Sequence, residues 1–230
     1  MQRRYCEQKR AGVRVETRDD SEAPMIVGHA AVFFNEDEPG TEFRLGRNLR
    51  ERIAPEAFEG ALERGDDVRA LRDHEPSLLL GRTTNGTLRL SVDERGLAFE
   101  IDPDETSVGR DTRMMIQRGD LTGASFGFIV SKEEFADDGD DVIRTIRSVD
   151  PLLDVSPVTY PAFPATDTAV RDFSQGLACY IAEHRDDDAT RRLETRAAKL
   201  GIVVPKRYNP GALARHRARQ LELMERELRR

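Results

Sequence analysis

One serine is flanked by glycines, in the segment Gly123-Ala124-Ser125-Phe126-Gly127. The segment fits the pattern G-x-S-x-G, which in α/β-hydrolases holds a nucleophilic serine on a sharp turn between a strand and a helix. Here, however, Phe126, Phe128 and Val130 alternate with other residues, a spacing that predicts a strand. We therefore expect Ser125 to lie within a strand, as a nucleophile or as a small residue placed where a bulky one would clash.

A nucleophilic serine needs a base that takes its proton, and histidine is the most common one. His184 and His216 lie in a charged region, where a solvated side chain is expected. His29 lies in an apolar strand, where a packing role is expected. His74 follows a predicted strand and comes shortly before Pro76, a position from which a side chain can face a cleft. His74 is the candidate base, although its position alone favours a structural role equally.

The third member of such a site is an acid that orients the histidine. Asp154 lies inside the otherwise apolar segment Leu152–Val158, and a buried carboxylate needs a partner because burial of charge is costly. Asp150 competes for this role, but an aspartate before a proline is also explained as a turn residue. Glu75 adjoins His74 in the sequence, which on a strand places it on the opposite face. Asp154 is the preferred acid and Asp150 the alternative.

The elements that must position these residues are mainly strands. Alternating or apolar runs bounded by turn residues predict strands at 12–16, 25–34, 68–71, 78–81, 87–92, 97–101, 124–130, 142–146 and 152–159. The pair 87–92 and 97–101 flanks a turn that ends in Gly96, which predicts a hairpin. Short helices are predicted at 55–62 and 104–118. The expected fold class is mainly β with peripheral helices (α+β).

From about residue 166 the pattern becomes helical and polar. The net charge of the chain is −7, but residues 191–230 hold 12 Lys and Arg against 4 Asp and Glu. We therefore expect a folded domain over residues 1–165 and a charged helical tail over 166–230, with its clearest helix at Gln220–Leu228. Because the arginines lie among Leu, Met and Glu at helical spacing, a partner-binding helix explains the tail better than nucleic-acid binding.

Composition excludes several other classes of protein. The two cysteines, Cys6 and Cys179, are too few for a disulfide framework or a zinc site and favour a reducing compartment. No apolar run approaches the ~18 residues that indicate a membrane span. The first residues lack the apolar segment of a secretory signal. We expect a protein of the reducing cytoplasm, without a membrane partner.

Several segments occur in a distinctive order along the chain: Val27–Phe33, Glu51–Phe58, Val68–His74, Leu80–Arg82, Asp93–Leu97, Gly119–Phe128 and Leu153–Ala162. As an ordered set they resemble the prohead maturation proteases of tailed bacteriophages, whose fold resembles that of the herpesvirus assemblin serine proteases. The resemblance covers about residues 12–165 and is far more specific than any single segment.

The resemblance implies both a fold and a set of roles. The fold is an antiparallel, assemblin-like β-barrel. His74 is the general base, Ser125 the nucleophile and Asp154 the third member, at a position where the family commonly has a glutamate. An α/β-hydrolase esterase has the order Ser–acid–His and would have to use His184 instead, which leaves it a minor alternative.

The implied activity is that of a serine endopeptidase inside the phage prohead, in the host cytoplasm, with no metal or organic cofactor. Its expected substrates are the scaffold, or the scaffolding segment of the major capsid protein, and its own chain. We also expect a homodimer or higher homo-oligomer, and a tail that joins the scaffold or is removed by autocleavage. The alternative is a non-catalytic capsid-assembly module on the same fold, which the three filled positions argue against.

Overall fold

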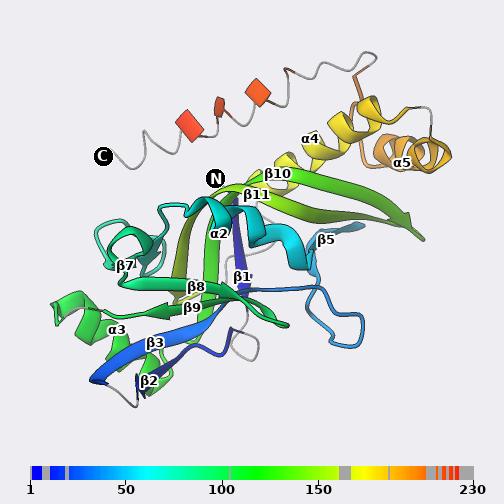
Figure 1. Ribbon diagram of the computed structural model, residues 1–230. Helices are drawn as coiled ribbons and strands as arrows, with labels where there is room; N and C mark the ends of the chain where they lie inside the picture. The colour runs from blue at the N-terminus through cyan, green and yellow to red at the C-terminus, as the bar shows by residue number, and fades with distance from the viewer. Residues whose placement is uncertain are drawn as a thin grey trace.

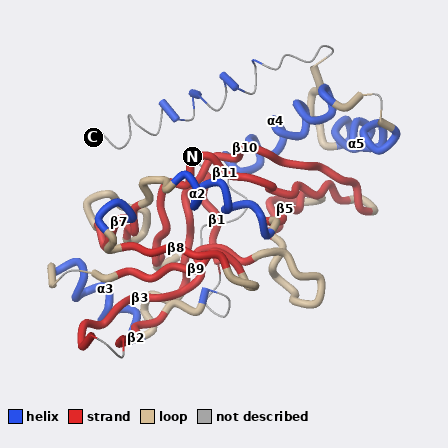
Figure 2. Tube along the Cα trace, viewed as in Figure 1, coloured by secondary structure: helices blue, strands red, loops and turns tan. Residues whose placement is uncertain are grey.

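The computed structural model describes residues 2–6, 11–18, 21–103, 105–160, 167–185, 187–205, 211, 214–215, 218–219 and 221–222. Its elements are, in chain order, β1 (Gln2–Cys6), β2 (Arg14–Arg18), β3 (Ser21–Val32), β4 (Phe43–Gly46), β5 (Leu49–Ile53), η1 (Pro55–Phe58), α2 (Glu59–Arg64), β6 (Arg69–Leu71), β7 (Leu79–Arg82), η2 (Thr83–Asn85), β8 (Leu88–Val92), β9 (Gly96–Ile101), α3 (Ser107–Arg118), β10 (Gly123–Asp138), β11 (Asp141–Val158), α4 (Asp167–Glu183) and α5 (Asp188–Lys199). Strands dominate, with α3 at one end of the molecule and α4 and α5 at the other (Figure 1, Figure 2). The predicted mainly β, α+β class is confirmed.

The described strands form two sheets. One has the order β1-β10-β11-β5-β4, with β6 also paired to β11 and β7 paired to β6. The other has the order β2-β3-β9-β8. The predicted hairpin over 87–92 and 97–101 is confirmed as β8 and β9, which pair antiparallel.

The expectation of one closed antiparallel barrel is wrong for the described strands. The first half of β11 pairs parallel with β5, and its second half pairs parallel with β6. One long strand therefore serves two partners in succession, and the sheet branches instead of closing. Hydrophobic alternation shows which face of a strand is buried, but not which strand lies beside it or in which direction, so the sequence could not reveal this exchange.

The hairpin of β10 and β11 is longer than the sequence pattern predicted. The predicted strands at 142–146 and 152–159 are parts of the single 18-residue strand β11, and β10 extends over 16 residues. The register shifts several times between Gly127 and Glu133. Such irregularities bend a strand pair. They divide the hairpin into a base, which includes Ser125 and Asp154, and a distal arm.

The predicted helices are displaced by a few residues. The helix expected at 55–62 is a 3-10 turn, η1, that continues into α2 and ends at Arg64. The helix expected at 104–118 begins at Ser107 because the hydroxyl of Thr106 accepts the backbone N–H of Gly109 at 3.2 Å and caps it. Position 104 lies outside the described residues.

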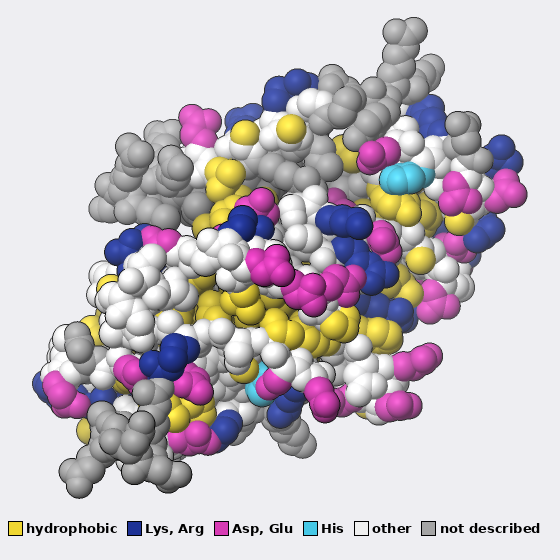
Figure 3. Space-filling model, viewed as in Figure 1, with side chains coloured by type: hydrophobic (Ala, Val, Ile, Leu, Met, Phe, Trp, Pro, Cys, Tyr) yellow, Lys and Arg dark blue, Asp and Glu magenta, His cyan; other side chains and the backbone are white. Residues whose placement is uncertain are grey.

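The main core lies between the two sheets. Its aromatic centre is formed by Phe58, Phe126 and Phe128, with ring centroids 5.4 Å apart for the first pair and 4.7 Å for the second. Both β10 rings are almost fully buried, and strand alternation places these two residues on the same face. In Figure 3 apolar side chains reach the surface in a band across the middle of the molecule, with charged side chains of both signs beside it.

A second apolar cluster joins α4 and α5 to the distal arm of the hairpin. It contains Leu45, Leu49, Phe135, Val142, Phe173, Leu177, Ile181, Leu193 and Ala197. The chain is thus helical over α4 and α5, but these helices bury one face against the body. The predicted helix at 220–228 lies mostly outside the described residues. A separate charged helical tail is not confirmed, and the division of the chain at residue 165 remains a prediction.

A buried arginine ties α4 to three strands. Arg144 on β11, 1% exposed, contacts Glu51 at 3.1 Å, Glu133 at 2.5 Å and Asp172 at 2.9 Å. Burial alone would lower the pKa of Arg144, but the surrounding carboxylates raise that pKa by more than burial lowers it, so the guanidinium stays charged. Removing Arg144 would leave three buried carboxylates without this compensation, which is strongly destabilising.

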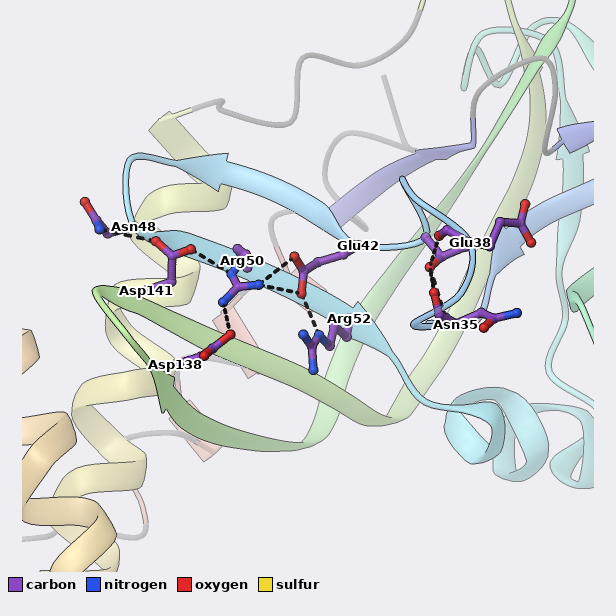
Figure 4. Close-up of polar contacts among 9 residues, drawn as sticks. Asn35, Glu38, Glu42, Asn48, Arg50, Arg52, Asp138 and Asp141 are labelled. Atoms are coloured by element: carbon purple, nitrogen blue, oxygen red, sulfur yellow. Dashed lines mark hydrogen bonds and ion pairs between the residues drawn. The ribbon is translucent and has the colours of Figure 1, made fainter.

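A surface cluster fastens the β4–β5 hairpin to the tip of the arm (Figure 4). Arg50 contacts Glu42 at 3.1 Å, Asp138 at 2.5 Å and Asp141 at 2.8 Å, and Arg52 contacts Glu42 at 2.6 Å. Single ion pairs at a surface contribute little, but here the Arg50 side chain is only 15% exposed and bonds to several carboxylates, a network that holds its members in a fixed arrangement. Among the described residues, no helix is both long and apolar enough to cross a membrane.

Candidate active site

Ser125 lies within β10, as its alternating neighbours predicted. Because Phe126 and Phe128 point into the core, alternation directs the side chain of Ser125 to the opposite face. The register places Ser125 between Ser156 on β11 and Tyr5 on β1. Ser125 is 0% exposed, and the strand continues beyond it. The strand–turn–helix geometry of an α/β-hydrolase nucleophile is therefore not present at this serine.

His74 lies in the turn that links β6 to β7. Asp73 and His74 both have left-handed backbone conformations, with φ angles of 54° and 58°. Residues with side chains rarely adopt this conformation, and each such residue costs about 1–3 kcal/mol unless its surroundings hold it. The turn is closed by backbone hydrogen bonds from Arg72 N–H to the Leu78 carbonyl and from Glu75 N–H to the Arg72 carbonyl, both at 3.0 Å.

Asp73 fastens this turn to the end of β11. Its backbone N–H donates to the carbonyl of Pro157 at 3.0 Å. Thr159 donates its backbone N–H to Asp73 Oδ1 at 2.6 Å and its hydroxyl to Oδ2 at 3.0 Å. These three bonds join the residue before His74 to the strand that carries Asp154, and so fix the histidine backbone relative to the acid.

The structure brings His74, Ser125 and Asp154 into one row of hydrogen bonds. His74 Nε2 lies 2.7 Å from Ser125 Oγ, and His74 Nδ1 lies 2.5 Å from Asp154 Oδ1. The side chains of His74 and Asp154 are only 8% and 6% exposed. With Nδ1–H donated to the carboxylate, Nε2 presents its lone pair to the serine hydroxyl. This arrangement can remove a proton from Ser125 and stabilise the imidazolium that forms.

A second serine supports the acid. Ser156 is fully buried and donates its hydroxyl to Asp154 Oδ1 at 2.7 Å. The two residues are two apart on β11, so strand alternation places their side chains on the same face. The carboxylate thus accepts bonds from both Ser156 and His74, which holds it in one orientation and compensates part of its burial.

The alternative acids lie elsewhere. Asp150 is 55% exposed on its side chain and contacts Arg64 at 3.3 Å. Glu75 turns away to the solvent and accepts the hydroxyl of Ser77 at 2.9 Å. The structure therefore pairs His74 with Asp154 and with neither competitor.

His29 and His184, the other two histidines among the described residues, are not at this site. His29 Nε2 lies 2.8 Å from Asp93 Oδ2, where it links β3 to the β8–β9 turn. His184 follows α4, where Nδ1–H donates to the carbonyl of Tyr180 at 2.9 Å and the imidazole stacks on the Tyr180 ring. An esterase site built from Ser125, Asp154 and His184 has no support from these positions. His216 lies outside the described residues.

Three residues of the site were missed in the sequence. Ser156 could have been found, because it lies two residues from Asp154 on the same strand face. Asp73 is adjacent to the candidate base, and both Asp and His are enriched in left-handed conformations, but these residue types alone do not predict a left-handed pair at 73 and 74. Thr159 is 86 residues from its partner, a pairing that only the fold establishes.

Known proteins were compared with the whole chain. The sequence family described as caudovirus prohead serine protease matches residues 11–177, a range that includes His74, Ser125 and Asp154. No curated protein and no solved structure matches the chain significantly. The described residues include no group of three or more His, Cys, Asp or Glu side chains arranged to hold a metal ion.

Proposed function

Because the chain belongs to the caudovirus prohead serine protease family, we propose that it is a serine endopeptidase of phage capsid maturation that uses Ser125, His74 and Asp154. The observation that carries the proposal is the unbroken row of hydrogen bonds from Ser125 Oγ through the imidazole to Asp154. His74 is 51 residues from Ser125 and 80 residues from Asp154 in the sequence, and it lies in the β6–β7 turn whereas they lie on the β10–β11 hairpin.

The proposed reaction is acyl transfer to the serine followed by hydrolysis. Ser125 Oγ attacks the carbonyl carbon of the scissile peptide, while its proton passes to His74 Nε2. The resulting imidazolium is stabilised by Asp154 and then gives the proton to the departing amine, which breaks the C–N bond. Water attacks the acyl ester next and gives a proton to His74. The new carboxyl group leaves as the proton returns to Ser125.

The proposed substrates follow from the family. They are the scaffold or the scaffolding segment of the major capsid protein, and the protease chain itself. The proposed place of action is the interior of the prohead in the host cytoplasm, where the enzyme acts as a homodimer or higher homo-oligomer. These proposals rest on the membership of the chain in the caudovirus prohead serine protease family.

The test is co-expression with the major capsid protein, followed by intact-mass measurement of both chains. Wild type should produce shortened capsid protein, and Ser125→Ala should leave it at full length. Ser77→Ala, at an exposed serine in the turn after His74, is the matched control and should cleave as wild type does. Equal cleavage by wild type and Ser125→Ala would remove Ser125 from the mechanism. Assembly without any cleavage would favour the non-catalytic module.

A further inference from the structure

The edge of β10 that faces away from β11 is occupied by β1. The two strands pair antiparallel, from Gln2 opposite Phe128 to Cys6 opposite Ala124, with Tyr5 directly opposite Ser125. The proposed nucleophile thus lies on a strand with a neighbour on each side, and its exposed fraction is 0%. A substrate can reach Ser125 only if something beside it moves.

An endopeptidase must hold an extended stretch of its substrate beside the nucleophile. Addition of a strand to a sheet edge is a general way to bind extended peptides, because main-chain hydrogen bonds supply the affinity. Of the two edges of β10 at Ser125, the one toward β11 is fixed, since β11 carries Asp154 and closes the hairpin. The edge that holds β1 remains for the substrate.

The two neighbours of β10 differ in how firmly they are held. β11 has 18 residues and also pairs with β5 and β6, whereas β1 has five and stands at the end of the strand order. β1 is therefore the strand that can be exchanged while the rest of the site stays in place.

We propose that β1 occupies the substrate-strand position, so that Gln2–Cys6 blocks Ser125 until a substrate peptide displaces it and pairs antiparallel with Ala124–Phe128. The inference rests on the proposed function of Ser125 and extends it to regulation of that site. The partner is an extended peptide with backbone N–H groups free to pair, so proline is disfavoured opposite β10.

A chain that lacks residues 2–6 tests the block. The readout is the rate at which a small fluorophosphonate attaches covalently to Ser125, followed by intact mass, with Ser125→Ala as the unlabelled control. We expect the shortened chain to react at least about tenfold faster. If β1 leaves Ser125 accessible less than about a tenth of the time, the full chain reacts at less than about a tenth of the rate of the open site. A peptide of residues 2–7 carrying Cys6→Ser should slow the shortened chain saturably, whereas a scrambled peptide of the same composition should not.

A second pair of variants keeps the full length and guards against misfolding of the shortened chain. In Arg4→Pro/Tyr5→Pro, one of the two prolines removes an N–H that points toward β10, because successive N–H groups along a strand alternate in direction. Arg4→Ala/Tyr5→Ala removes the same side chains and keeps both N–H groups. The proline pair should react faster than the alanine pair, and equal rates would contradict the proposal.

The outcomes separate this inference from the proposed function. Equal labelling of the full and the folded shortened chain overturns the block and leaves the role of Ser125 intact. If Ser125 reacts in no variant, the proposed function fails. The β10 edge that β1 occupies is then tested by fluorescence anisotropy, with a fluorescently labelled peptide of residues 2–7 carrying Cys6→Ser and the shortened Ser125→Ala chain. Saturable binding that unlabelled peptide competes away supports the docking edge, and absence of binding overturns it.

Discussion

At the scale of single residues, the bond between His74 and Asp154 gives the acid a testable role. Asp154→Asn keeps the shape but presents an amide to Nδ1, which favours the wrong imidazole tautomer. We expect cleavage to slow by at least ~100-fold with little change in unfolding temperature, by analogy with the same change in other triads. Asp150→Asn is the matched control and should be nearly silent, since Asp150 is exposed and contacts Arg64. Rates in the reverse order would mean that the acid is Asp150.

Asp73 offers a second test at this scale, of a residue that positions His74 without touching substrate. Asp73→Ala removes both acceptors of Thr159 and places alanine in a left-handed conformation. We expect kcat to fall about 10- to 100-fold, because a small misplacement of a catalytic group is costly, while KM changes little. Asp73→Asn keeps an acceptor for the Thr159 N–H and tolerates that conformation, so it should restore most of kcat.

The control for Asp73 is Glu75→Ala, in the same turn but at an exposed side chain, which should leave kcat unchanged. If Asp73→Asn loses as much kcat as Asp73→Ala, the Thr159 bonds and the backbone conformation do not position His74.

Residue types predicted two members of the row, Ser125 and Asp154, but not the residues that support it. An acid inside an apolar strand and a serine among alternating aromatics are local signals, so Asp154 and Ser125 could be found without coordinates. The assignment of His74 needed the ordered likeness to a family, because its position alone left a structural role open. Asp73 and Thr159 act through a contact that closes only when β6 and β11 lie side by side.

At the scale of elements, the packing of α4 on the hairpin arm is testable by one deletion in its apolar face. Phe173 is fully buried and lies edge-on to Phe135, with ring centroids 5.4 Å apart. Phe173→Ala should lower the free energy of unfolding by about 3–5 kcal/mol, because it opens a cavity in a shared core. Urea unfolding measures the change, and Arg171→Ala, at an exposed position of α4, is the control. A silent Phe173→Ala would support a folded body that ends near residue 165.

Strands and hairpins were predictable where the signal was local. The β8–β9 hairpin has a glycine-containing turn between two alternating runs, and it was found with nearly correct bounds. The long β10–β11 hairpin was predicted as shorter strands, because Pro151 separates the segments 142–146 and 152–159 and because residues 131–138 of β10 are mostly charged. Proline removes a donor from the ladder, which usually ends a strand. Here β11 continues through Pro151 and Pro157.

At the scale of the whole molecule, carboxylates with lowered pKa values make stability depend on pH. A hydrogen bond from Arg82 lowers the pKa of Asp67 more than burial raises it. Burial raises the pKa of Asp93, but bonds from His29 and the amides of Arg95 and Gly96 lower it by more.

A carboxylate whose pKa is lower in the folded state contributes stability above its unfolded value of about 4, and this is lost as pH falls through the folded pKa. We expect the unfolding temperature to drop as pH is lowered from about 5 to 3. Asp67→Asn should flatten that drop, whereas Asp188→Asn, at a highly exposed position of α5, should not. Parallel curves for wild type and Asp67→Asn would exclude Asp67 as a source of the dependence.

The hairpin base has a mechanical consequence for the proposed protease. Ser125 and Asp154 lie on two paired strands, so the hairpin fixes the spacing between them. His74 lies in a separate turn, which the hydrogen bonds of Asp73 join to the end of β11. We therefore expect loss of the Asp73 bonds to displace His74 while Ser125 and Asp154 keep their spacing. Such a site loses activity without unfolding, and it regains activity when the Asp73 bonds form again.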